Sequence, residues 1–166
     1  LLTSSSDHSG HFANLLGAGE EFGIKLYYAV QKNPKGGIPE AIMLAEEFSK
    51  DEKVLVILGD NIFNFNLKKV VDRFNKKNSG AVVFGVRKNT ESKQYGVIEI
   101  DKNGKVLSIE EKPDKPKSDI AQTGIYMYDE TVVDKIKNLS PSARGELEVT
   151  DLNNMYVKDG TMHCEI

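Results

Sequence analysis

Residues 54–88 read VLVILGDNIFNFNLKKVVDRFNKKNSGAVVFGVRK and predict a strand, a helix and a second strand in that order. Val54–Leu58 is a continuous apolar run, which is typical of a strand covered on both faces. Residues 66–78 are amphipathic, and residues 80–88 predict another buried strand. The side chains expected on the core side of the helix are Leu67, Val70, Val71 and Phe74.

The rest of the chain continues this alternation. Upstream, we expect a short helix within residues 5–19 that stops at Gly17, a strand over 23–30 and a helix over 38–50. Downstream, Asp-Lys-Asn-Gly at residues 101–104 joins two alternating strands and predicts a hairpin. A strand, two helices and a last strand follow, at residues 123–129, 130–139, 147–160 and 161–166. The pattern predicts an α/β fold with a mixed, mostly parallel sheet flanked by helices.

Composition narrows the class of protein. The 166 residues are 39% apolar, enough for one packed domain, and carry a net charge of −3. No cluster of lysine and arginine interleaves with aromatic residues, which argues against nucleic acid as a partner. No apolar run approaches the roughly 20 residues of a membrane span. The single Cys164 excludes an internal disulfide. We therefore expect a cytoplasmic protein that binds neither nucleic acid nor membrane.

Asp60 is the first candidate site residue. It follows Gly59 at the end of the predicted strand Val54–Leu58. Ligands of open α/β sheets bind outside the carboxyl ends of the strands, and carboxylate oxygens suit Mg²⁺ that is shared with substrate phosphates. Asp60 is therefore a candidate Mg²⁺ ligand. The alternative is that Asp60 or Asn61 caps the next helix or shapes a turn.

The second candidate site is the loop QKNPKGG at residues 31–37, which begins with Gln31. Its amide offers a donor and an acceptor, which match the imide edge of thymine or uracil. Gly36 and Gly37 expose backbone groups beside it. The alternative is a solvent-exposed turn.

Charged side chains form the third candidate set. Lys112 follows Glu111 at the end of a hairpin strand, and Arg144 lies in the glycine-containing loop ARGE. An ammonium and a guanidinium fit two phosphate contacts, and a carboxylate such as Glu111 can accept hydrogen bonds from sugar hydroxyls. Each is alternatively a solvated surface charge. No Gly-x-Ser-x-Gly, P-loop or Cys-x-x-Cys pattern occurs, so covalent catalysis has no candidate.

Six segments, taken in order, resemble the bacterial sugar-1-phosphate nucleotidylyltransferases and, within that family, the thymidylyl branch. The segments are VQKNPKGGIPEA, LGDNIF, YGV, IEEKP, TGIYMYD and PSARGELEVTDLNN. The resemblance covers essentially the whole chain. It implies a Rossmann-like nucleotide-diphospho-sugar transferase fold, with a single domain over residues 1–166, a nucleotide-binding part over 1–90 and a sugar-phosphate-binding part over 91–166.

The resemblance also implies a role for each candidate residue. Gln31 and Gly37 would contact the thymine base, and Asp60 would bind Mg²⁺ near the nucleotide sugar. The residues that would hold glucose are Tyr95, Gly96, Glu111 and the backbone of Thr123 and Gly124. Those that would hold the sugar phosphate are Lys112 and Arg144, which with Asp60 would be the catalytic groups.

The reaction implied is attack of a glucose-1-phosphate oxygen on the α-phosphorus of dTTP. It releases pyrophosphate and forms dTDP-glucose, a precursor of cell-surface polysaccharide of the dTDP-rhamnose type. Such an in-line displacement needs positioning, a metal and nearby cations, and no enzyme nucleophile. Members of the family form tetramers, so the resemblance implies a homo-oligomer.

The chain departs from the family pattern in three respects. The family's Gly-x-Gly-Thr-Arg triphosphate loop and its Trp-x-Asp-x-Gly-Thr segment, with a second metal-binding Asp, do not occur in these 166 residues. We therefore expect a domain that is incomplete at both ends and nearly inactive alone. Pro39-Glu40 stands where the family usually has Ala-Gln or a similar pair, and is a candidate cause of a change in the base-side helix or in the nucleotide preference. The alternatives are a nucleotidylyltransferase for another nucleotide or sugar, of the UTP and UDP-glucose type, and a non-catalytic sugar-nucleotide-binding domain.

Overall fold

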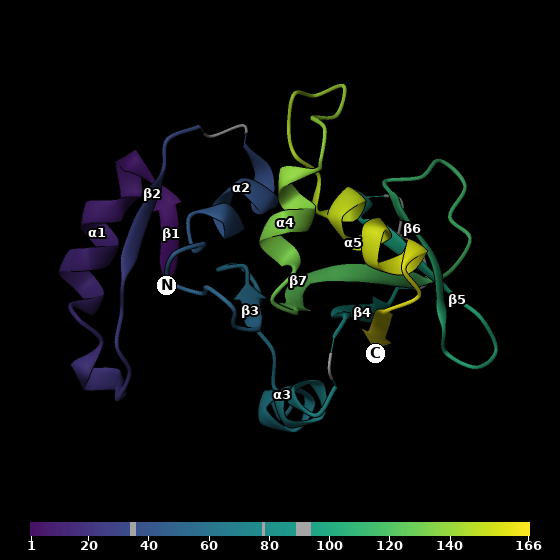
Figure 1. Cartoon of the computed structure of the whole chain (residues 1–166), viewed down its shortest axis with the longest axis horizontal. Helices are drawn as coiled ribbons and strands as arrows, with labels where there is room; N and C mark the ends of the chain where they lie inside the picture. The colour runs from purple at the N-terminus through teal and green to yellow at the C-terminus, as the bar shows by residue number, and fades with distance from the viewer. Residues whose placement is uncertain (34–35, 78, 89–93) are drawn as a thin grey trace. The chain divides into compact units, whose positions relative to one another are not determined.

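The chain forms two compact units in a computed structural model. The first contains Leu1–Lys50 and Val133–Val149, and the second contains Asp51–Val132 and Thr150–Ile166. Figure 1 labels most of their helices and strands. The parts of the chain that the structure describes are residues 1–33, 36–77, 79–88 and 94–166. These units are defined by contacts within the chain and not by ligand binding. The expected division into a nucleotide-binding part and a sugar-phosphate-binding part near residue 90 therefore stays a prediction.

The first unit is built on two short parallel strands. β1 (Leu2–Ser5) pairs with β2 (Tyr28–Gln31), and α1 (Ser6–Leu16), followed by the 3₁₀ helix η1 (Glu20–Phe22), connects them. β2 starts later than predicted. The N–H groups of residues 24 and 26 donate instead to carbonyls of the preceding turn, at 3.2 and 2.9 Å.

The helix predicted over residues 38–50 is confirmed only in its first half. α2 (Gly37–Met43) starts near the expected position and ends at Met43. Beyond it the N–H groups donate across three residues, from Ala45 to Ile42 at 2.9 Å and from Glu46 to Met43 at 3.1 Å, which is the spacing of tight turns. Ile42 is buried, whereas Phe48 on the predicted apolar face is 52% exposed.

The second unit contains a six-stranded sheet of order β6-β5-β7-β4-β8, with β3 also paired to β7. The strands are β3 (Val54–Ile57), β4 (Ala81–Arg87), β5 (Gly96–Ile100), β6 (Val106–Glu111), β7 (Ile120–Tyr128) and β8 (Met162–Glu165). The helices that accompany them are α3 (Leu67–Asn75) and α5 (Val149–Lys158), while α4 (Val132–Lys137) begins at the boundary of the unit. Among the described residues, no helix combines the length and apolar character that a membrane crossing requires.

Strand β7 joins the sheet together. One edge pairs antiparallel with β4, and the other pairs antiparallel with β5 at Ala121 and with β3 over Ile125–Tyr128. Of the described pairs in this sheet, only β4 and β8 are parallel. The α/β fold with a mixed sheet is confirmed, but the expectation of mostly parallel pairing is corrected. β3 and β4 run in the same direction, as a strand-helix-strand unit requires, yet β7 lies between them.

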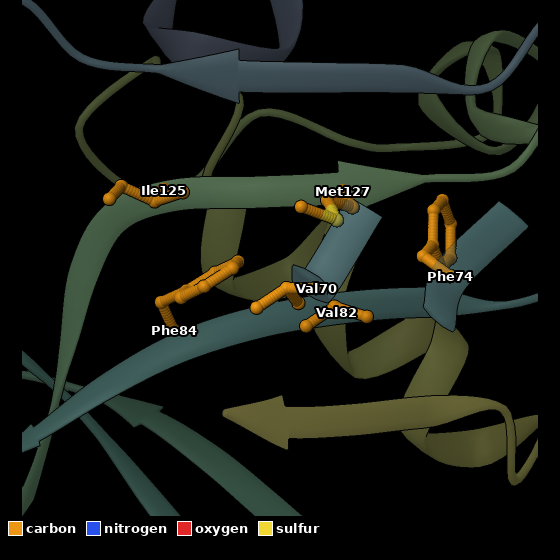
Figure 2. Close-up of a cluster of buried hydrophobic side chains, with 6 residues drawn as sticks. All are labelled: Val70, Phe74, Val82, Phe84, Ile125 and Met127. Carbon is orange, nitrogen blue, oxygen red and sulfur yellow. The ribbon is translucent and has the colours of Figure 1, made fainter. Parts of the chain in front are cut away.

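The core of the second unit lies between α3 and the sheet. Figure 2 shows the buried cluster of Val70 and Phe74 from α3, Val82 and Phe84 from β4, and Ile125 and Met127 from β7. Leu67 and Val71 pack against it and are partly buried. The predicted apolar face of this helix is therefore confirmed. α3 begins after Asn66, whose side chain accepts a hydrogen bond from the N–H of Lys69 at 3.3 Å.

Strand β3 differs from the strand that its apolar run predicts. Its side chains alternate in burial, and Leu55 and Ile57 remain 41% and 43% exposed. Among the described residues β3 pairs with β7 alone, so it lies at an edge of the sheet. The expectation that both faces are covered is wrong for this strand.

The predicted hairpin is confirmed as β5 and β6. The carboxylate of Asp101 accepts hydrogen bonds from the N–H groups of Asn103 and Lys105, at 2.8 and 2.9 Å. Gly104 has φ +82°, a conformation that a glycine adopts without strain. The register of the hairpin places Gly96 opposite Glu111, which matters for the site.

Candidate functional site

The loop after β3 carries Asp60 and is fixed to β7. The N–H of Leu58 donates to the carbonyl of Gly124 at 2.8 Å, and the N–H of Asn61 donates to the carbonyl of Leu58 at 3.0 Å. The Asn61 side chain accepts from the N–H of Gly124 at 3.0 Å and donates to Asp60 Oδ1 at 2.7 Å. One asparagine thus joins the candidate metal ligand to the sheet.

Gly124 leaves the space that this loop needs. A Cβ atom at Gly124 would lie 2.5 Å from Asn61 Nδ2 and 2.8 Å from Leu58 Cβ. Both backbone groups of Gly124 are bonded to the loop, so a sugar contact at this residue would use the second lone pair of its carbonyl oxygen. The alternative that Asp60 or Asn61 shapes a turn is confirmed, and the alternative that either caps the next helix is wrong, because Asn66 caps α3.

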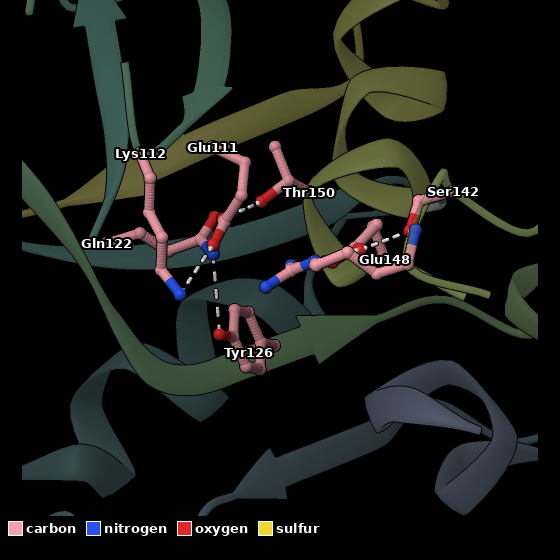
Figure 3. A network of polar contacts seen from close by, with 8 residues as sticks. Glu111, Lys112, Gln122, Tyr126, Ser142, Glu148 and Thr150 are labelled. Atoms are coloured by element: carbon pink, nitrogen blue, oxygen red, sulfur yellow. Dashed lines mark hydrogen bonds and ion pairs between the residues drawn. The ribbon is translucent and has the colours of Figure 1, made fainter. Parts of the chain in front are cut away.

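Glu111 and Lys112 lie at the end of β6 in the second unit. Figure 3 shows Glu111 accepting a hydrogen bond from Thr150 Oγ1 at 2.8 Å, with Lys112 Nζ 3.8 Å from the other carboxylate oxygen. Lys112 has φ +43°, an unusual conformation for a residue with a side chain. Strain of this kind is found where the surrounding structure holds a side chain at a functional site.

The charges of both Asp60 and Glu111 affect the pKa of the Tyr126 hydroxyl. Burial raises the pKa of the Tyr126 hydroxyl well above its usual value, and the charges of Glu111 and Asp60 raise it further. The hydroxyl therefore stays protonated. Gln122 Nε2 lies 3.5 Å from this hydroxyl (Figure 3). Gln122 Oε1 accepts a hydrogen bond from Asn153 Nδ2 at 3.0 Å. Tyr126, Gln122 and Asn153 thus form a buried polar network.

The hairpin register brings the expected glucose-binding residues together. Gly96 pairs with Glu111, and the N–H of Lys112 donates to the carbonyl of Tyr95 at 3.1 Å. A Cβ at Gly96 would lie 3.2 Å from Gln122 Nε2, tighter than most real contacts. The Tyr95 hydroxyl is 3.1 Å from the ammonium of Lys88, which also lies 4.2 Å from the centre of the tyrosine ring.

The hydroxyl of Thr123 donates its proton within the sheet. Its Oγ1 donates to the carbonyl of Phe84 at 2.9 Å, which holds β7 against β4. The resemblance implies a sugar contact through the backbone of Thr123, and this stays a prediction.

Arg144 lies in the first unit, in the loop before α5. Its guanidinium donates to Glu148 at 2.9 and 3.0 Å, and Glu148 also accepts from Ser142 Oγ at 2.7 Å. Figure 3 labels Ser142 and Glu148 of this group. The N–H of Arg144 donates to Ser142 Oγ at 3.2 Å. Arg144 is thus held by a carboxylate, while 51% of its side chain stays exposed.

The candidate base-reading residues also lie in the first unit. Gln31 Nε2 donates to the carbonyl of Gly37 at 3.0 Å and to Glu40 Oε2 at 3.2 Å. Gly37 has φ +73°, and a Cβ there would lie 2.2 Å from the carbonyl oxygen of Leu147. Pro34 and Lys35 of the same expected loop lie outside the described residues.

Asp60 fits an Mg²⁺ ion that is shared with substrate. Its carboxylate is exposed, and Oδ2 makes no hydrogen bond within the described residues. One carboxylate oxygen with several places left for water and phosphate is the usual arrangement for this ion. The described residues contain no group of three or more His, Cys, Asp or Glu side chains that could hold a metal by themselves.

Several residues of the site were not predicted from the sequence. Thr150, Ser142 and Glu148 belong to the segment PSARGELEVTDLNN, which the resemblance singled out as a block without assigning their roles. Glu40 was noted only as a departure from the family pattern. Gln122 and Tyr126, two of the buried positions of β7, gave no signal, because their importance depends on the strands beside them.

The strands and helices define an α/β protein with a mixed sheet, and comparison gives the family. The chain belongs to the nucleotidyl transferase family, whose model matches residues 1–166. It is a homologue of glucose-1-phosphate thymidylyltransferases. It is 45% identical over 167 aligned residues to such a protein from Neisseria gonorrhoeae and 40% identical over 166 to one from Xanthomonas campestris.

Solved structures agree with this assignment. A Bacillus anthracis protein assigned as a glucose-1-phosphate thymidylyltransferase, solved in complex with sucrose, is 43% identical and superposes with a TM-score of 0.90 over 98% of this chain. A UDP-glucose pyrophosphorylase shares the fold, with a TM-score of 0.75 and 23% identity. The chain spans 57% of the Neisseria gonorrhoeae relative and 65% of the Bacillus anthracis chain.

Proposed function

We propose that this protein acts in thymidylyl transfer from dTTP to glucose-1-phosphate, and that its second unit contributes the metal-binding and sugar-phosphate groups. The observation that supports this most is the placement of Asp60, Glu111 and Lys112 in one unit. Asp60 and Glu111 both act on the Tyr126 hydroxyl, and Lys112 follows Glu111 directly. The carboxylate of Asp60 suits a metal ion, the carboxylate of Glu111 suits sugar hydroxyls, and the ammonium of Lys112 suits a phosphate.

Each of these groups has a distinct task in the proposed reaction. Glu111, oriented by Thr150, accepts hydrogen bonds from glucose hydroxyls. Lys112 places a positive charge at the sugar phosphate, whose oxygen forms the new bond to the α-phosphorus as the bond to pyrophosphate breaks. Asp60 would hold Mg²⁺, which supplies charge stabilisation for the phosphates. The reacting oxygen comes from the substrate, so no side chain acts as nucleophile.

In the first unit, the proposed roles are base recognition and a second cation. Gln31 and Gly37 would meet the base, and Arg144 would meet the sugar phosphate. Glu148 holds the guanidinium through two nitrogen atoms, which fixes the direction of its other face. A guanidinium fixed in this way loses little side-chain entropy when it binds a phosphate.

A uridylyl donor is the second candidate, because the Gln31 amide does not by itself distinguish uracil from thymine. The amide of Gln31 meets a part of the base that thymine and uracil share, and the two bases differ by one methyl group. Such a difference is worth only about 1–3 kcal/mol in a binding pocket. We therefore expect a preference for the thymidine nucleotide over the uridine nucleotide that is modest rather than absolute.

Other parts of the account stay predictions. The 166 residues contain no Gly-x-Gly-Thr-Arg segment, so we expect weak turnover by the chain alone. A cytoplasmic location and a homo-oligomer, expected from composition and from the family resemblance, likewise stay predictions.

Competitive binding tests the proposed function. A fluorescent dTDP-glucose analogue is bound to the chain, and dTDP-glucose, UDP-glucose and ADP-glucose compete with it in the presence of Mg²⁺. We expect dTDP-glucose to compete best, UDP-glucose within about tenfold of it and ADP-glucose poorly. Equal competition by all three, from a chain shown by circular dichroism to be folded, would overturn the assignment to a pyrimidine nucleotide.

A further inference from the structure

We infer that Glu40 is a positioning residue that turns the Gln31 side chain into a pure hydrogen-bond acceptor, so that the protein selects pyrimidine bases with an N–H at position 3. The inference deepens the proposed function and rests on it, because it requires the base to lie at Gln31. All the residues that carry it belong to the first unit.

The hydrogen bonds of the Gln31 amide decide which atom remains for a ligand. A glutamine amide has two N–H donors on one nitrogen and one carbonyl oxygen. Gln31 Nε2 faces two acceptors, the carbonyl of Gly37 at 3.0 Å and Glu40 Oε2 at 3.2 Å. These two acceptors match the two N–H groups. Within the described residues Oε1 makes no hydrogen bond, so this acceptor is what remains for a base.

Glu40 is itself held in place. Its Oε2 lies 1.0 Å from the position that a Cβ of Gly36 would occupy, so the carboxylate fills the space above a glycine. Gly36 is buried, and Glu40 is half-buried on the first turn of α2. The carboxylate cannot move toward Gly36 and is directed to Gln31. An acceptor fixed beside Nε2 opposes rotation of the amide by half a turn, because Oε1 would then face two acceptors.

The consequence for base recognition follows from hydrogen-bond chemistry. Thymine and uracil carry a donor, N3–H, at the centre of the pairing edge, and cytosine carries an acceptor there. A fixed acceptor at Gln31 bonds the first two bases and repels cytosine. A freely rotating amide would offer its N–H to cytosine and lose this discrimination. The sequence alone left both possibilities open, since Gln31 offers a donor and an acceptor.

UDP-glucose and CDP-glucose form a matched pair of probes, because they differ only in the base. We titrate the chain with each in the presence of Mg²⁺ and compare dissociation constants. The wild-type chain is expected to bind UDP-glucose more tightly by on the order of tenfold, since cytosine leaves an acceptor facing an acceptor.

Three variants identify the cause of this discrimination. In Glu40→Ala the Gln31 amide can rotate, and the ratio of the two dissociation constants is expected to fall about threefold or more. Glu40→Gln can still turn an oxygen toward Gln31 Nε2, so it should retain most of the ratio. Glu47→Ala removes one exposed carboxylate from the same unit and is the matched control, with no expected change.

A measurement without nucleotide tests the fixed amide by itself. Gln31→Ala identifies the side-chain amide signals of Gln31 in a ¹⁵N–¹H spectrum. We expect the two protons of Gln31 to exchange slowly with water in the wild-type chain and rapidly in Glu40→Ala. Equal exchange in the two proteins would overturn the inference even if nucleotides bind.

The outcomes separate this inference from the proposed function. UDP-glucose binding with the same discrimination in wild-type and Glu40→Ala proteins overturns the role of Glu40 and leaves the proposed function intact. A folded wild-type chain that binds neither nucleotide sugar would contradict the proposed function. It would also contradict selection of the base at Gln31, which rests on that function. A loss of discrimination in Glu40→Ala that Glu40→Gln restores supports the inference.

Discussion

The side-chain oxygen of Asn61 accepts a hydrogen bond from the N–H of Gly124 at 3.0 Å, and this bond fixes the loop after β3 to the central strand β7. The amide nitrogen of the same side chain donates to Asp60 Oδ1 at 2.7 Å. The orientation of the candidate metal ligand is therefore set by a strand from a distant part of the sequence. Asp60 lies on a loop, but Asn61 links its carboxylate to strand β7.

Asn61→Ala is expected to weaken both stability and metal-dependent binding. The substitution leaves the N–H of Gly124 without its partner and releases the Asp60 carboxylate. We expect the free energy of unfolding in urea to fall by about 1–3 kcal/mol. The affinity for dTDP-glucose in Mg²⁺ should fall as well. Asn64→Ala, at an exposed position of the same loop, is the control. Unchanged stability and affinity in Asn61→Ala would show that the loop is held by other contacts.

Gly37→Ala is expected to destabilise the first unit. Gly37 has φ +73°, and a Cβ there would lie 2.2 Å from the carbonyl oxygen of Leu147, a backbone atom that cannot turn aside. The left-handed conformation alone costs about 1–2 kcal/mol, and the close contact adds to it. Gly10→Ala is the matched control: Gly10 lies within α1 with nothing near its Cβ position, so alanine should stabilise the helix by about 0.5–1 kcal/mol. Urea unfolding of both variants measures the contrast.

Lys112→Asn separates charge from backbone conformation. Asparagine tolerates the positive φ of this position better than most residues, so the fold should be retained while the ammonium is lost. We expect the affinity for glucose-1-phosphate to fall roughly tenfold, as for the loss of one charge-assisted hydrogen bond. Binding of glucose itself should change little. Lys102→Asn, in the exposed hairpin turn, should leave both affinities unchanged. An equal loss for glucose and glucose-1-phosphate would contradict a phosphate contact.

Asp129 predicts a pH dependence of stability. Burial alone would raise the pKa of this carboxyl, but hydrogen bonds from Thr131, Gly80 and Tyr156 outweigh burial and lower the pKa below its ordinary value. A pKa lowered by folding stabilises the folded state above the unfolded pKa of about 4, and this stabilisation is lost as the pH falls through the folded pKa.

Asp129→Asn tests this dependence. We expect a loss of about 1–3 kcal/mol in the free energy of unfolding at neutral pH. The difference from the wild-type protein should begin to narrow below about pH 4, because the unfolded chain then takes up a proton at Asp129 while the folded carboxyl, with its lowered pKa, stays ionised to lower pH. Asp134→Asn, at an exposed position, is the control. A difference that stays constant from pH 7 to pH 3 would show that the charge of Asp129 contributes nothing.

Local sequence patterns predicted the individual helices and strands better than they predicted which strands are neighbours in the sheet. The α3 face with Val70 and Phe74 and the hairpin around Gly104 were predicted, because both depend on residues close in sequence. The exposed face of β3 and the place of β7 between β3 and β4 were not, since strand order depends on pairings between distant segments.

The candidate site shows the same limit. Asp60, Glu111 and Lys112 could be found from residue type at strand ends, and the hairpin register explains why Tyr95 and Gly96 belong with them. The groups that orient them come from other elements. Asn61 is bonded to β7, Thr150 lies on α5 and Glu40 lies on α2. No short sequence pattern predicts such contacts.

Calorimetric titration of the chain with dTDP-glucose, with and without Mg²⁺, tests the central claim most directly. We predict that Mg²⁺ strengthens binding to the wild-type chain and that Asp60→Ala abolishes this effect of Mg²⁺. Asp72→Ala, which removes an exposed carboxylate from α3, should behave like the wild-type chain. Absence of binding to the folded chain, or the same effect of Mg²⁺ in Asp60→Ala as in the wild-type chain, would contradict the account.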